Sequence, residues 1–96
     1  MKTQVSRHLS SISEEIDTAH AGLRRLRDRL ELQRAALDEQ RLRMLIAETP
    51  LADRDLHTVA EGFLDLSREV LHAEETLGAL LEEQTRLSRS LLTAGA

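Results

Sequence analysis

Apolar residues recur along the first half of the chain in alternating steps of four and three. From residue 5 to residue 47, only Gln33 and Gln40 interrupt this series. Its apolar members are Val5, Leu9, Ile12, Ile16, Ala19, Leu23, Leu26, Leu30, Leu37, Met44 and Ala47. A repeat of 3.5 residues places one narrow apolar seam along a long α-helix, and such a seam requires a partner. The pattern therefore predicts a long helix over about residues 4–48.

A second seam with the same spacing follows Thr49-Pro50. Its apolar members are Leu56, Val59, Phe63, Leu66, Val70, Ala73, Leu77, Leu80, Leu87 and Leu91. Gln84 occupies the seam position between Leu80 and Leu87. Proline disfavours the helical conformation in the residue before it, but it is favoured as the first residue of a new helix. We therefore expect a turn at residues 49–50 and a second helix over about residues 51–92.

The short connection predicts that the two seams fold back on each other. The expected fold is all-α: a single domain of residues 1–96 that forms a two-helix antiparallel coiled-coil hairpin. The numbers of paired residues should sum to about 100, which places Leu37 near Phe63. A slip of half a heptad in either direction stays open. The glutamines within the seams, Gln33, Gln40 and Gln84, either fix this register or lie at a solvent-exposed edge of the seam.

Charge favours the antiparallel orientation. Residues 20–47 contain seven arginines and four acids, a net charge of +3, whereas residues 51–85 contain two arginines and nine acids, a net charge of −7. Each exposed ion pair contributes about 0.2–1 kcal/mol, so such pairs select orientation more than they stabilise the fold. The expected neighbours are Arg43 and Asp55, Arg29 and Glu69, and Arg27 and Glu74.

The chain has more apolar residues than a hairpin can bury. The surplus lies on the back of the first helix near the turn and on one side of the second helix. Its members are Leu32, Leu42, Leu45, Ile46, Ala60, Leu64 and Leu71. Contiguous exposed apolar surface marks interfaces, although single surface leucines are common. We therefore expect a homodimer, which forms a four-helix bundle, and a second protein as a further partner.

Composition limits the remaining function classes. The net charge of −4 argues against non-specific nucleic-acid binding. The absence of cysteine excludes disulfides and thiolate metal sites. No signal peptide or membrane-spanning stretch is recognisable, so the expected location is the cytoplasm. Twelve arginines against one lysine are typical of a GC-rich bacterial genome.

Two groups of residues suggest ligand chemistry. Arg24, Arg25 and Arg29 form a basic group, and arginine forks bind phosphate, so a small anionic ligand such as a nucleotide is one alternative. Glu69 and His72 have the spacing of metal ligands in helical bundles, so a metal-binding helical bundle is a second alternative.

No arrangement of residues suggests catalysis or a cofactor. The expected function is a non-catalytic protein–protein interaction module, an adaptor, chaperone or regulator, with an anti-sigma-like role as an analogy of fold.

Overall fold

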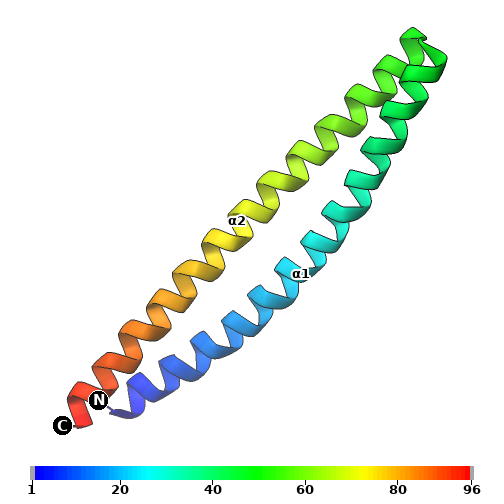
Figure 1. Ribbon diagram of the computed structural model, residues 1–96. Helices are drawn as coiled ribbons and strands as arrows, with labels where there is room; N and C mark the ends of the chain where they lie inside the picture. Colours follow the sequence, from blue (N-terminus) through cyan, green and yellow to red (C-terminus); the bar gives the residue numbers. More distant parts are fainter. Residues whose placement is uncertain (1, 96) are drawn as a thin grey trace. The chain divides into compact units, whose positions relative to one another are not determined.

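The computed structural model describes residues 2–95 and contains two helices. Helix α1 spans Lys2–Ala47 and helix α2 spans Pro50–Gly95, each unbroken along its length (Figure 1). Residues 1 and 96 of the expected domain lie outside the described part. The prediction of an all-α helical hairpin is confirmed. Helix α1 begins two residues before and ends one residue before the predicted range of 4–48, and α2 begins one residue before and ends three residues after the predicted range of 51–92.

The turn consists of Glu48 and Thr49, so Pro50 belongs to α2 and not to the turn as the sequence predicted. Glu48 has a left-handed backbone (φ 47°), and its N–H donates a hydrogen bond to the carbonyl of Met44 at 2.9 Å. The Thr49 hydroxyl accepts a hydrogen bond from the backbone N–H of Ala52 at 3.2 Å, which caps α2. Pro50 is then the first helical residue, where its missing N–H has no cost.

The chain divides into two compact units. Unit 1 combines α1 up to Leu23 with α2 from His72, and unit 2 is Arg24–Leu71 and includes the turn. Within unit 2 the two helices leave the turn in antiparallel directions (Figure 1).

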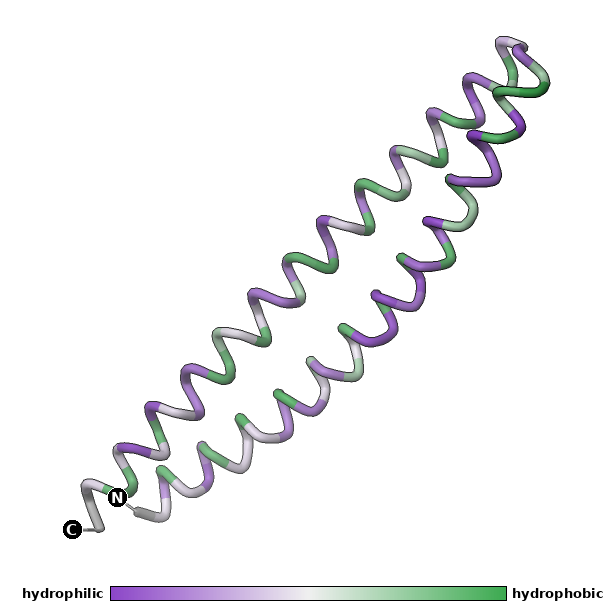
Figure 2. The backbone as a smooth tube through the Cα atoms, in the orientation of Figure 1, coloured by the Kyte–Doolittle hydropathy of each residue, from purple (hydrophilic) through white to green (hydrophobic). Residues whose placement is uncertain are grey.

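The buried side chains all belong to the two seams. In unit 1 they are Ile12, Ile16, Leu23 and Leu77, and in unit 2 they are Leu37, Leu66 and Val70. The other seam positions are half-buried, apart from Ala47, which is exposed at the end of α1. Figure 2 shows the corresponding recurrence of hydrophobic segments along both helices. The 3.5-residue spacing therefore identified the residues that pack.

Two contacts between the helices bear on the register within unit 2. The Gln33 side chain donates a hydrogen bond from Nε2 to the carbonyl of Val59 at 3.2 Å, and the Arg34 guanidinium lies 5.8 Å from the centre of the Phe63 ring. The numbers of these two pairs sum to 92 and 97, not to about 100. The turn occupies residues 48–49, one residue earlier than predicted, which accounts for part of this difference, and the sequence leaves a slip of half a heptad open. Gln33 thus contributes to the register rather than lying at a solvent-exposed edge of the seam.

Ion pairs within single helices compete with the expected pairs between helices. Arg43 and Asp55 line the same groove, but the Arg43 guanidinium binds Glu39 of its own helix at 2.7 Å. A partner one turn away on the same helix is reached without crossing between helices. Three further pairs of this kind are Arg41 with Asp38, Arg68 with Asp65, and Arg86 with Glu83.

Gly62 makes room for the Gln33 amide, and this contact gives a testable coupling. A Cβ atom at Gly62 would lie 2.9 Å from Gln33 Nε2. Alanine raises helix propensity by about 1 kcal/mol, but it would displace an amide whose hydrogen bond contributes about 1 kcal/mol. Gly62→Ala should therefore change the free energy of unfolding by less than about 0.5 kcal/mol, whereas in a Gln33→Ala background it should stabilise by about 1 kcal/mol. Urea unfolding of the four proteins measures this coupling.

Gly78→Ala is the matched control. A Cβ atom there would meet nothing within 4 Å, so the substitution should stabilise by about 1 kcal/mol in both backgrounds. If Gly62→Ala gave the same gain with and without Gln33, the role of this contact in the register would be contradicted.

Candidate protein-interaction surface

Helix α1 of unit 2 carries an apolar stripe on the side away from its seam. Its positions alternate in steps of three and four, like the seam itself, and Leu45 lies beside them. They are Leu32, Ala35, Glu39, Leu42 and Ile46, and we call them the outer stripe. The large aliphatic members are strongly exposed, Leu32 at 73% and Ile46 at 85%. This stripe therefore has the spacing of a helix-packing surface, but no helix in the described part of the chain covers it.

Helix α2 of unit 2 carries a second such stripe beside its seam. It consists of Ala60, Leu64, Ser67 and Leu71, and we call it the side stripe. Leu64 and Leu71 are 53% and 59% exposed, while Ala60 and Ser67 are half-buried. The sequence reasoning missed Ser67 because it considered apolar residues only. The steps of four, three and four would have identified it.

The surface near the turn also includes Leu51, which the sequence reasoning missed. Leu51 is exposed and lines, with Ile46, a groove of about 340 Å³ beside the turn. As the second residue of α2 it precedes the seam, so no periodic signal could have assigned it. It continues the apolar surface of the outer stripe towards α2.

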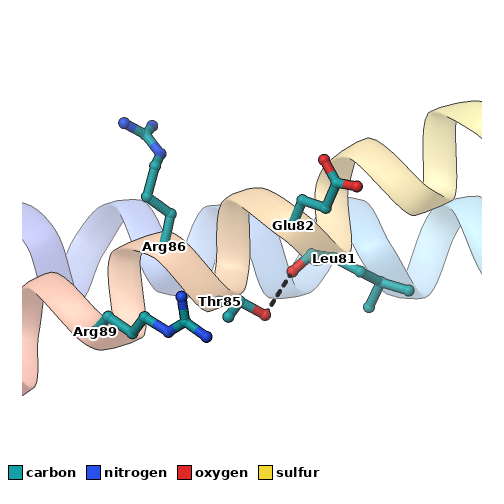
Figure 3. Close-up of a pocket in the computed structure, with 5 residues that line it drawn as sticks. All are labelled: Leu81, Glu82, Thr85, Arg86 and Arg89. Atoms are coloured by element: carbon teal, nitrogen blue, oxygen red, sulfur yellow. Dashed lines mark hydrogen bonds between the residues drawn. The ribbon is translucent and has the colours of Figure 1, made fainter.

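One groove is formed by α2 alone. The groove in Figure 3 has a volume of about 470 Å³, and all five of its lining residues belong to α2. The Thr85 hydroxyl in this groove donates a hydrogen bond to the carbonyl of Leu81 at 3.0 Å. A surface made by one helix leaves most of a small ligand in water, whereas ligand sites bury most of it.

Arginine in this groove is already paired. Arg86 donates hydrogen bonds to Glu83, which lowers the pKa of the Glu83 carboxyl and raises the pKa of the Arg86 guanidinium. The groove therefore presents Arg89 and a neutralised pair, not two guanidinium groups that converge on an anion.

The other predicted ligand residues are exposed. Arg24, Arg25 and Arg29 lie at the surface of α1, and none of the five grooves described in the structure includes them. Glu69 and His72 are exposed as well. Within residues 2–95, no group of three or more histidines and acids is arranged to hold a metal ion.

The helices also lack a membrane-crossing stretch: in the described residues, neither is apolar enough over a sufficient length.

The interface residues of the sequence analysis thus lie mainly on two stripes of unit 2. Leu32, Leu42 and Ile46 belong to the outer stripe, Leu45 lies beside it, and Ala60, Leu64 and Leu71 belong to the side stripe. Comparison of the chain with protein-family models, with curated proteins and with solved structures gave no match.

Proposed function

We propose that the protein is a non-catalytic protein–protein interaction module of the bacterial cytoplasm. It acts as an adaptor, chaperone or regulator, in the manner of an anti-sigma factor, through helix faces of a dimeric helical hairpin. The observation that carries this proposal is the outer stripe, a regularly spaced row of exposed aliphatic side chains opposite a seam that is itself occupied.

The energetics of the outer stripe support a partner. Covering one large aliphatic side chain contributes about 1.5–3 kcal/mol. Leu32, Leu42 and Ile46 lie in one row, so a single amphipathic helix from another protein can cover all three at once. Such a helix would need apolar residues at steps of three and four, and this is the form of partner that the stripe fits.

Charge in the outer stripe favours a different protein over a second copy. Glu39 occupies the centre of the stripe and is paired with Arg43 on its own helix. If two outer stripes packed in parallel, Glu39 of one copy would meet Glu39 of the other, and in an antiparallel pairing it would meet the apolar Leu42 or Ala35 of the other copy. Like charges across a helix interface are unfavourable, and so is a charge against apolar side chains, so the stripe suits a partner with a basic or polar residue at this layer.

Photocrosslinking tests the proposal. A photoreactive amino acid replaces Leu42 in cells that naturally make the protein. We expect one defined covalent adduct, which mass spectrometry identifies, and its loss when Ile46→Asp is added. The same amino acid at Asp28 is the matched control, because Asp28 is exposed on the same side of α1 two heptads earlier. Equal labelling from the two positions would overturn the assignment of the outer stripe.

A further inference from the structure

We infer that the side stripe of α2 binds a second copy of this chain, with the two α2 helices antiparallel. This inference rests on the proposed function, because it assumes that the chain acts through its helix faces. It adds the identity of the partner that the side stripe binds. In the inferred contact Leu64 packs against Ser67 of the second copy, and Ala60 packs against Leu71 of the second copy. The two-fold axis passes between Asp65 and Leu66, and each contact therefore occurs twice.

The side chains of the stripe have complementary sizes in this arrangement. Leu64 and Leu71 are exposed, whereas Ala60 and Ser67 are small and half-buried. Antiparallel pairing places each leucine against a small residue, so that protruding side chains enter the gaps above the small ones. A parallel pairing would place leucine against leucine and small residue against small residue.

Ser67 can be covered without an unsatisfied polar group. Its hydroxyl donates a hydrogen bond of 2.9 Å to the carbonyl of Phe63, one turn earlier on the same helix. Burial of a hydroxyl is costly mainly when its hydrogen bond to water is lost without replacement. Here the replacement already exists in the single chain, so the serine behaves as a small packing residue.

Charge selects one register. The residues that flank the stripe on its outer edge are Glu61 and Arg68. In the inferred register Glu61 lies opposite Arg68 of the second copy, twice by symmetry. Sliding one copy by a heptad brings Arg68 against Arg68 in one direction and Glu61 against Glu61 in the other, and like pairs are unfavourable.

Arg68 has the donors for this pair. It contacts Asp65 at 3.2 Å, and both side chains are 75% exposed, so the guanidinium is not committed to a buried partner. The remaining N–H groups of its fork are available to a second carboxylate.

The surface area of the chain matches the requirement of a dimer. Its accessible surface is 7369 Å², whereas a compact folded protein of its mass, 10.8 kDa, exposes about 5,500 Å². A standard interface covers about 800 Å² on each partner. The difference between the two values is larger than this area, so the chain has surface for one such contact in addition to the outer stripe.

Charge exchange within the full chain tests the inference. Sedimentation equilibrium at low salt should show a dimer for the natural sequence. Glu61→Arg should weaken this dimer about tenfold, because the introduced guanidinium then faces Arg68 of the second copy. Glu61→Arg combined with Arg68→Glu should restore the original affinity, since the pair is re-formed with its charges exchanged. Glu31→Arg makes the same charge change on α1 and should leave the dimer unchanged.

A packing variant provides an independent measurement. Leu71→Ser should weaken the dimer by at least about 100-fold, because symmetry removes two leucines from the contact. Circular dichroism should show unchanged helix content, since Leu71 is exposed in the single chain.

Two results would overturn the inference: a monomer at about 100 µM, well above the dissociation constant expected of a standard interface, or a dimer that neither the charge exchange nor Leu71→Ser affects. A monomer would also remove the dimer from the proposed function, but the adduct at Leu42 tests the outer stripe by itself and would be unchanged in both cases.

Discussion

Leu23→Ala is expected to lower the free energy of unfolding by about 2–4 kcal/mol. Leu23 is the most buried side chain of the described residues, with 3% of its surface exposed. Truncation removes its apolar contacts and leaves a cavity that the surrounding side chains close only in part. Urea unfolding followed by circular dichroism measures the loss as a lower midpoint at unchanged slope.

Leu32→Ala is the matched control for this prediction. It makes the same chemical change on the same helix, but Leu32 is 73% exposed and should lose less than about 0.5 kcal/mol. Because Leu32 lies outside the side stripe, this comparison holds for a monomer and for the inferred dimer. Equal losses from the two substitutions would mean that the seam is not the surface on which the helices pack.

The seams were predictable because periodicity is a local property of the sequence. A residue such as Leu66 is assigned to the buried side of α2 by its spacing from Phe63 and Val70 alone. The all-α hairpin follows from two such seams and one proline, and the structure confirms it. Neither step requires knowledge of which residues meet across the interface.

The register was less predictable because it depends on the turn and on individual side chains. Glu48 adopts a left-handed backbone, a conformation more often occupied by glycine, and α1 ends at Ala47, one residue before the predicted end. The fit of the Gln33 amide over Gly62 adds a contact that spacing cannot reveal. These features choose among the registers that the sequence leaves open.

The candidate surface was predictable in part. Leu42 and Ile46 follow from a count of apolar residues beyond the seams, and the structure places them on the outer stripe. The spacing of Ser67 from the leucines of the side stripe is visible in the sequence, but its hydrogen bond to Phe63 shows that this serine can act as a packing residue. The identity of a partner depends on a second molecule, so sequence periodicity can indicate the form of the partner but not its name.

The second large effect is expected at Phe63, the single aromatic residue of the chain. Phe63→Ala should lower the free energy of unfolding by about 2 kcal/mol, less than the roughly 3–5 kcal/mol typical of a fully buried ring, because Phe63 is half-buried. The ring packs at a seam position of unit 2, and alanine would leave that layer without a large side chain. Thermal and urea unfolding both measure the loss.

Two variants separate the packing of Phe63 from its contact with Arg34, whose guanidinium lies 5.8 Å from the ring centre. Phe63→Leu keeps an apolar side chain in the layer and should cost less than about 1.5 kcal/mol. Arg34→Met keeps the aliphatic stem and removes the charge, and it should cost no more than about 1 kcal/mol, the value of an exposed cation–π contact. The double variant Arg34→Met with Phe63→Ala should lose less than the sum of the single losses. If Arg34→Met alone cost as much as Phe63→Ala, the ring would act mainly as a site for the guanidinium, and its assignment to the seam would be wrong.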